Sequence, residues 1–214
     1  LKMDEIFDQV TLMDKQSRRY FNRPISNIVF MGMGEPLMNY NNMIAAIKKI
    51  TQYRKFGISS KRITISTSGI PKMIMKLADE DFKFKLAVSL HSANQLIREK
   101  IMPFTIKFPI TDLIESLNYW YLKTNRIITL EYIVWENINS KKSDINDLIN
   151  FCKKVPSKVN LIQYNSIGDD DYKGASFDII NKYQIELLKH GINSTYRRSR
   201  GADIDAACGQ LANK

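Results

Sequence analysis

The chain has 214 residues, which suits one domain with a sizeable core, and its 44% hydrophobic and 25% charged residues are an ordinary globular mixture. No apolar run reaches the roughly 18 residues that span a membrane, and no secretory signal opens the chain, so composition argues against a membrane-spanning or secreted protein. The net charge of +10 favours a polyanionic partner such as RNA, although frequent Lys, Ile and Asn are equally consistent with a compositional bias.

The cysteine content and the first residue add two further expectations. Two cysteines in a chain of this length indicate a reducing compartment without a disulfide framework, and we therefore predict a cytoplasmic protein. Because the chain begins with Leu1 rather than Met, we expect a fragment or a processed product.

Strand and helix patterns alternate along the first half of the chain. A polar periodic segment with Ile6, Val10 and Leu12 predicts an opening helix, and the short apolar run 28–31 predicts a buried strand. The next predicted elements are a helix over 41–53, a β-branched strand over 62–67, a helix begun by Pro71, a strand over 86–90, and a helix around Ile97 that ends before Pro103.

The same alternation continues through the second half. Thr111 or Asp112 is expected to cap a helix whose apolar stripe is Leu113, Ile114, Leu117, Trp120 and Tyr121. Later elements are a strand over 127–135, a helix with Ile145, Leu148, Ile149 and Cys152 on one face, a strand over 159–164, a helix over 177–190 closed by Gly191, and a strand over 194–197.

Strands that are separated by helices imply parallel pairing with right-handed crossovers, which places the chain in the α/β class. The sheet could close into a barrel or stay open, and periodicity does not decide between the two. No linker, repeat or low-complexity tract interrupts the pattern, so we predict a single domain over residues 1–214.

Ligands of parallel α/β folds bind at the carboxyl ends of the strands, so the residues that follow each strand are the candidate site. After the first strand, Gly34 lets the backbone approach a ligand, and Glu35 offers a carboxylate for an ammonium group; a tight turn with a solvent-facing Glu explains the string equally well. The other strands end in polar groups that could converge on one ligand, although turns alone also favour such residues: Ser66, Thr67 and Ser68, then Ser89, Leu90 and His91, then Asn165.

The two cysteines differ in their surroundings. Cys152 falls on the apolar stripe of a helix, which indicates a small core residue. Cys208 lies among small residues after the last strand, near Asp203 and Asp205, where a thiol is either open to a ligand or an inert part of a loop.

A basic cluster precedes that loop. Arg197, Arg198 and Arg200 could contact phosphates through their planar guanidinium groups, or form a solvated basic turn. His190, beside Gly191, is expected to favour the helix dipole and to have no chemical role.

Five strings in this order and spacing resemble the radical S-adenosylmethionine (SAM) adenine-C2 methyltransferases of 23S rRNA and tRNA. They are Met-Gly-Met-Gly-Glu-Pro-Leu at 31–37, Ser-Thr-Ser-Gly at 66–69, Ser-Leu-His at 89–91, Asn165, and Arg-Gly-Ala-Asp-Ile-Asp-Ala-Ala-Cys-Gly-Gln-Leu at 200–211. The resemblance runs from about Asp4 to Asn213, and its first and last strings are the most specific to the family.

The resemblance implies a partial (β/α) barrel of the radical SAM type that lacks its first strand and its cluster loop. It implies that Gly34 and Glu35 bind the amino end of SAM and that Cys208 carries the methyl group on its way to adenine. In the family, one SAM methylates this thiol and a second SAM, cleaved at a 4Fe–4S cluster, supplies the radical that activates the S-methyl group. The remaining pocket residues that it implies are Ser66, Ser89, Leu90, His91 and Asn165.

The departures from the family are large. Its C-x-x-x-C-x-x-C loop does not occur in this chain, and cluster ligation requires thiolates, so we expect the ligands upstream of Leu1. The resolving cysteine and the small RNA-binding domain of the family are also absent, and we therefore expect this chain alone to be inactive.

Two other readings compete with the adenine-C2 assignment. The sibling enzyme that methylates adenine C8 shares the ending with the reactive cysteine, but Pro36 and the string Thr67-Ser68-Gly69 look more like the C2 enzyme. The second alternative is a non-catalytic RNA-binding domain that has lost the cluster. The resemblance further implies 23S rRNA, tRNA and an electron-donor protein as partners, no membrane, and a monomer.

Overall fold

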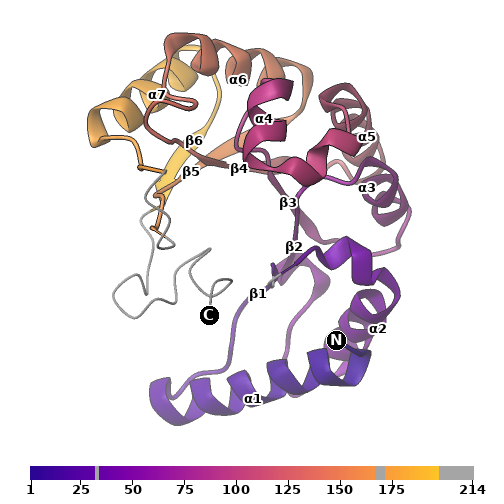
Figure 1. Ribbon diagram of the computed structural model, residues 1–214. Helices are drawn as coiled ribbons and strands as arrows, with labels where there is room; N and C mark the ends of the chain where they lie inside the picture. Colours follow the sequence, from indigo (N-terminus) through magenta and orange to yellow (C-terminus); the bar gives the residue numbers. More distant parts are fainter. Residues whose placement is uncertain (32–33, 167–171, 198–214) are drawn as a thin grey trace. The chain divides into compact units, whose positions relative to one another are not determined.

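The computed structural model describes residues 1–31, 34–166 and 172–197, and it shows an α/β fold (Figure 1). The described strands form one six-stranded sheet in the order β1-β2-β3-β4-β5-β6, and the pairs β1–β2, β4–β5 and β5–β6 are parallel. The parallel sheet with intervening helices confirms the α/β prediction, and all six strands expected from the pattern are present.

The strands and helices lie close to their predicted positions. The strands are β1 (Ile28–Phe30), β2 (Ile63–Thr67), β3 (Lys85–Ser89), β4 (Ile128–Ile133), β5 (Ser157–Ile162) and β6 (Ser194–Arg197). The α-helices are α1 (Met3–Phe21), α2 (Tyr40–Gln52), α3 (Pro71–Ala78), α4 (Gln95–Ile101), α5 (Ile110–Thr124), α6 (Lys142–Lys154) and α7 (Phe177–Lys189), with short 3₁₀ turns η1 (Pro36–Asn39), η2 (Ser60–Arg62) and η3 (Pro103–Lys107).

The chain divides into two compact units, and β3 contributes residues to both. The first unit consists of Leu1–Thr67 and Asp79–Ala87, and the second of Ser68–Ala78 and Val88–Lys214. That residues 1–214 form a single domain stays a prediction.

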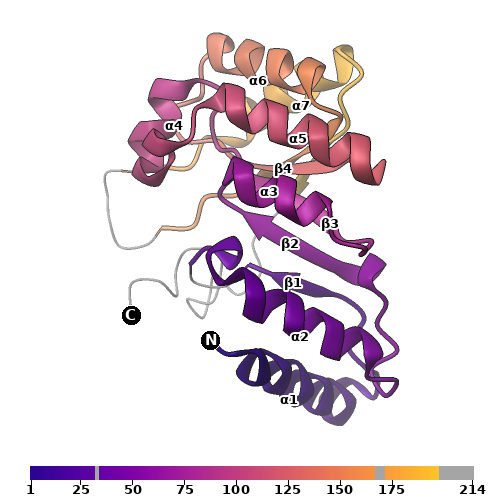
Figure 2. The ribbon, with the colours of Figure 1, turned by 90° about the vertical axis from the view of Figure 1, so that its right-hand side faces the viewer.

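In the first unit, α1 packs against α2, and the two helices lie side by side in Figure 2. The Phe7 ring contacts the Tyr53 and Phe56 rings at centroid distances of 5.5 and 5.7 Å, and Lys49 Nζ lies 2.7 Å from Asp4 Oδ1. Apolar side chains from α2 and β2 supply the core of this unit, because the spacing of the apolar residues in α2 places them on one face of the helix.

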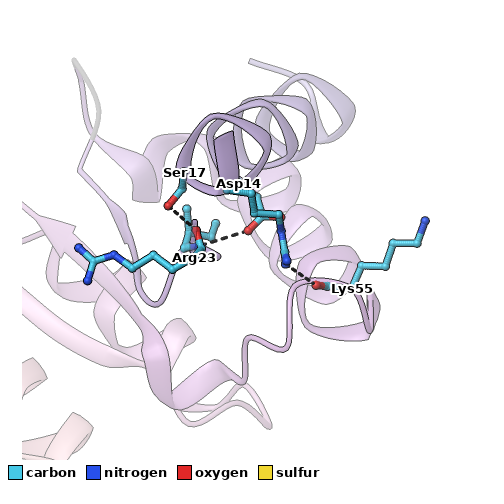
Figure 3. Close-up of polar contacts among 6 residues, drawn as sticks. Asp14, Ser17, Arg23 and Lys55 are labelled. Atoms are coloured by element: carbon cyan, nitrogen blue, oxygen red, sulfur yellow. Dashed lines mark hydrogen bonds and ion pairs between the residues drawn. The ribbon is translucent and has the colours of Figure 1, made fainter. Parts of the chain in front are cut away.

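The connection from α1 to β1 is fixed by a buried carboxylate, which Figure 3 shows. Asp14 Oδ2 accepts a hydrogen bond from Arg18 Nε at 2.8 Å, and Asp14 Oδ1 accepts one from the Ile25 backbone N–H at 3.1 Å. Ser17 Oγ donates to the Arg23 carbonyl at 2.8 Å, and Arg18 Nη2 donates to the Lys55 carbonyl at 3.2 Å. Both oxygens of the buried carboxylate are therefore hydrogen-bonded, and one of them ties the segment that leads into β1 to α1.

In the second unit, α3 packs against α5, and α6 packs against α7. Of the five residues predicted for the α5 stripe, Leu113, Leu117 and Trp120 are fully buried, and Ile114 and Tyr121 are half-buried. The register of the sheet pairs Glu131 with Asn160 and Asn160 with Thr195. Gly191 has φ +71°, which confirms the predicted left-handed end of the last helix.

Two details of the sequence reading are wrong. The first strand is not buried, because Val29 is 54% exposed and only the neighbours Ile28 and Phe30 are half-buried, as befits a strand with a described partner on one side. The cap of α5 is neither Thr111 nor Asp112. The helix begins at Ile110, directly after Pro109. Gln95 Oε1 accepts a hydrogen bond from the Ile110 N–H at 2.8 Å, so the side chain of Gln95, 15 residues earlier, takes the place of a local cap.

Candidate functional site

The turn after β1 lies beside a cavity in the first unit. Gly34 has φ +133°, and a Cβ added to it would meet no heavy atom within 4 Å among the residues that the structure describes, its chain neighbours aside. Gly34 and Glu35 line a cavity of about 500 Å³, together with side chains from α1 and β1. A volume of this size is within the range of small-molecule sites.

Glu35 also stabilises its own turn. Its Oε1 accepts a hydrogen bond from the Leu37 N–H at 3.0 Å and so caps η1. A carboxylate has about four acceptor positions, so this one hydrogen bond does not by itself exclude a cationic ligand. Both readings of Glu35 made from the sequence, the turn and the ammonium site, are compatible with this geometry.

Ser66 lies near the carboxyl end of β2, next to β1 in the parallel sheet of the first unit. It is buried, at 5% exposed. Since the carboxyl ends of parallel strands meet at one edge, Ser66 and the Gly34–Glu35 turn lie at the same edge of this sheet.

The turn after β2 is held by a buried arginine of the second unit. Arg98 Nη2 donates to the Ser68 carbonyl at 2.6 Å, and the side chain of Arg98 is fully buried. Burial lowers the pKa of Arg98 to about 10, so the guanidinium stays charged at neutral pH. Gly69 has φ +95°, and a Cβ there would lie 3.0 Å from Leu113 Cδ1 and 3.2 Å from Arg98 Nη2. Only glycine fits this turn without a shift of its neighbours.

The turn after β3 carries the Ser89-Leu90-His91 string. Ser89 ends the strand, the side chain of Leu90 is fully buried, and the N–H groups of Leu90 and His91 donate to the Glu131 carbonyl at 3.0 and 3.3 Å. His91 has φ +56°, a left-handed backbone that is uncommon outside glycine and is often found at functional sites.

The His91 ring is fixed in one protonation state. Nδ1 accepts a hydrogen bond from the Ile133 N–H at 3.2 Å, and the ring meets Trp135 edge to face at 5.7 Å. Burial, and then the charge of Arg98, lowers the pKa of His91 to about 4. At neutral pH the ring is therefore uncharged, and because Nδ1 is an acceptor, Nε2 bears the hydrogen.

Asn165 and Arg197 complete the described residues of the predicted site. Asn165 follows β5 and is buried, whereas Arg197 ends β6 and is exposed, next to Ile162 in the register. The second unit thus places Ser89, His91, Asn165 and Arg197 at the carboxyl ends of strands in one sheet. Arg198, Arg200 and Cys208 lie outside the described residues.

The other cysteine and the other histidine have structural settings. Cys152 is half-buried on α6, and burial raises the pKa of its thiol to about 11, which disfavours the reactive thiolate. His190 caps α7, with its Nδ1 2.9 Å from the Glu186 carbonyl oxygen.

The sequence analysis missed several polar residues of the second unit, of which Glu131, Arg98 and Asn139 are buried. Glu131 Oε2 accepts from Asn160 Nδ2 at 2.8 Å, and Asn160 Oδ1 accepts from Thr195 Oγ1 at 3.0 Å, which makes a polar ladder across β4, β5 and β6. Burial raises the pKa of Glu131. Arg98 and Asn139, both fully buried, were missed as well, because an Arg or Asn gives no sign of burial in a sequence.

Among the residues that the structure describes, no cluster of three His, Cys, Asp or Glu side chains could hold a metal ion. Over the same ranges, no helix is long and apolar enough to cross a membrane.

Comparison with known proteins identifies relatives along the whole chain. The chain is 61% identical over all 214 residues to the "Probable dual-specificity RNA methyltransferase RlmN" of Christiangramia forsetii, and 60% identical to the protein of the same name from Flavobacterium psychrophilum. These matches cover 61% and 62% of the relatives, so the chain spans about three fifths of their length. No protein-family model matches.

Among solved structures, a radical SAM methyltransferase from Sphaerobacter thermophilus superimposes with a TM-score of 0.94 at 35% identity, over 98% of this chain and 61% of that one. A domain of a pyruvate-formate lyase-activating enzyme from Bacteroides vulgatus, at 15% identity and a TM-score of 0.60, shares the fold alone. The fold is thus that of a radical SAM methyltransferase. More narrowly, the chain is similar along its whole length to the proteins named RlmN, of which it spans about three fifths.

Proposed function

We propose that the protein is a radical SAM methyltransferase that adds a methyl group to C2 of adenine in 23S rRNA and tRNA. The observation that supports it best is the 61% identity to a probable RlmN over all 214 residues. The strand-end turns agree with it, because a carboxylate, a glycine with open space beside it, and a neutral histidine follow the strands at the positions that the motifs predict.

In this proposal Glu35 binds the ammonium group of SAM, and Gly34 leaves room for the cofactor backbone. Ser66, Ser89, Leu90, His91 and Asn165 line the rest of the pocket. The cavity of about 500 Å³ in the first unit, which Gly34 and Glu35 line, is large enough for the amino acid end of SAM. Bound SAM would supply the methyl group, Cys208 would accept it as a thiolate, and S-adenosylhomocysteine would be the leaving group.

A 4Fe–4S cluster does not fit the residues of this chain. Its two cysteines are fewer than the three that a radical SAM loop requires, and the thiol of Cys152 is held protonated. We therefore derive no step at the cluster from these residues, and the proposal requires cluster thiolates outside residues 1–214.

RNA is the partner that the net charge of +10 favours. Arg197, together with Arg198 and Arg200, is proposed to contact its phosphates. An electron-donor protein, a monomeric state and a location in the cytoplasm complete the proposal.

The direct test is nucleoside mass spectrometry after incubation of the full-length, cluster-loaded enzyme with methyl-labelled SAM, a reductant, and 23S rRNA or tRNA. Labelled 2-methyladenosine is expected. Labelled 8-methyladenosine would assign the protein to the C8 reaction instead, and RNA binding without any methylation would make it a binding domain.

A further inference from the structure

A fully buried amide lies behind the turn that carries His91. Asn139 follows β4 and is 0% exposed. Its Nδ2 donates to the His91 carbonyl at 2.7 Å and to the Ile133 carbonyl at 2.9 Å, and its Oδ1 accepts from the Trp135 N–H at 2.7 Å. Both hydrogens and the oxygen of the Asn139 amide are thus hydrogen-bonded to the backbone, at His91 after β3 and at Ile133 and Trp135 at the end of β4.

The orientation of this amide follows from its partners. Two carbonyl oxygens can only accept and the Trp135 N–H can only donate, so the reversed amide would oppose like groups at all three contacts. The assignment of Nδ2 and Oδ1 is therefore determined by the backbone, and Asn139 cannot turn over without losing every bond.

These bonds close a loop around His91. Asn139 holds the His91 carbonyl and the Ile133 carbonyl at the same time, while the Ile133 N–H donates to His91 Nδ1. The left-handed backbone of His91 needs support from outside the turn, since a non-glycine residue adopts φ +56° at a cost. The Asn139 amide supplies that support through its bond to the His91 carbonyl. Through its bond to the Ile133 carbonyl it also holds Ile133, whose N–H selects the tautomer of the His91 ring.

We propose that Asn139 is a positioning residue that holds His91 in its left-handed conformation and fixes its ring as the tautomer with hydrogen on Nε2. The ring then offers one hydrogen-bond donor, and no charge, to a ligand at the carboxyl end of β3. That this ligand is SAM rests on the proposed function.

A neighbouring contact offers a matched control. The Tyr183 hydroxyl of α7 donates to the backbone carbonyl of Asn139, so Tyr183→Phe perturbs the same segment without touching the amide. His190 serves as an internal reference, because its Nδ1 lies 2.9 Å from a carbonyl oxygen that can only accept. The two histidines of the chain are thus expected to be opposite tautomers.

The first measurement needs no variant. Long-range ¹H–¹⁵N NMR correlation of the imidazoles at pH 7.5 is expected to show His91 with hydrogen on Nε2 and His190 with hydrogen on Nδ1. Hydrogen on Nδ1 of His91 would overturn the proposal, whether or not the protein binds SAM.

The second measurement compares Asn139→Asp, which keeps an acceptor for Trp135 and removes both donors, with Tyr183→Phe. Asn139→Asp is expected to lose the single His91 tautomer and to weaken SAM binding in calorimetry by about ten-fold, which is the loss of about one hydrogen bond. Tyr183→Phe should keep both properties even if it lowers the melting temperature. An unaltered His91 signal in folded Asn139→Asp would contradict the proposal, whereas failure of the unmodified protein to bind SAM would contradict the proposed function alone.

Discussion

The turns after β1, β2 and β3 all follow the carboxyl ends of strands, but they differ in how closely other residues pack around them. The end of the β1 turn at Gly34 and Glu35 borders a cavity, and within the described part of the chain no heavy atom lies within 4 Å of a Cβ added to Gly34. The later turns are crowded: Gly69 is pressed against Leu113 and Arg98, and His91 is tied to Ile133 and Asn139. An open turn leaves volume for a ligand to fill, whereas a crowded one fixes the direction of the groups it presents.

The crowding can be tested at Gly69. Gly69→Ala is expected to destabilise the protein by about 2–5 kcal/mol, because left-handed strain of about 1–2 kcal/mol adds to overpacking of about 1–3 kcal/mol. Gly57→Ala is the control, since φ is +62° but nothing lies within 4 Å, and only the strain should remain. Chemical denaturation measures both changes. Equal losses in the two variants would show that the turn after β2 is not crowded.

The protonation of His91 should appear as a pH dependence of stability. Its pKa is lowered from 6.5 to about 4 in the folded protein, so the unfolded chain takes up a proton first as the pH falls. The contribution of the neutral His91 ring to the free energy of unfolding is therefore fully present above pH 6.5. It is lost between pH 6.5 and 4, by up to about 3 kcal/mol.

The comparison variant for this effect is His91→Asn. Asparagine tolerates the left-handed backbone, can accept from Ile133, and does not titrate, so its stability should depend less on pH over the same interval. A pH dependence unchanged by His91→Asn, measured by denaturation at pH 7 and pH 4.5, would rule out a buried neutral ring.

The open turn predicts a binding effect instead of a folding effect. Glu35→Gln keeps an oxygen for the Leu37 N–H and removes the charge, so stability should change little. Loss of a charge-assisted hydrogen bond should cost about 1.5–3 kcal/mol, or roughly ten-fold or more in SAM affinity by calorimetry. Equal affinity would leave Glu35 as a cap of η1 only.

The smallest effect is expected at the exposed end of β6. Arg197→Ala should reduce the slope of log affinity for RNA against log salt by about one unit, as for one lost phosphate contact. Lys107→Ala, which removes an exposed charge from η3, provides the control. The same slope in both variants and in the unmodified protein would remove Arg197 from the interface.

The difference between the turns also separates what the sequence could predict from what it could not. Strand ends and their Gly, Glu, Ser and His residues were predictable because each motif is local. The support behind His91 was not, since Asn139 binds a carbonyl 48 positions away and reads as an ordinary turn residue. Arg98 likewise reads as an exposed helix residue, but it is fully buried against the Ser68 carbonyl. The exposure of Val29 depends on its strand having one described neighbour, which an apolar run does not reveal.

The central claim is that Cys208 carries the methyl group and Cys152 does not. The most direct measurement uses the full-length, cluster-loaded enzyme with methyl-labelled SAM, followed by peptide mass spectrometry. Label is expected on the peptide with Cys208 and not on the one with Cys152, whose thiol has a pKa raised by burial to about 11. Cys208→Ala should abolish RNA methylation, while Cys152→Ala should keep it. Full methylation by Cys208→Ala, or label on Cys152, would contradict the account.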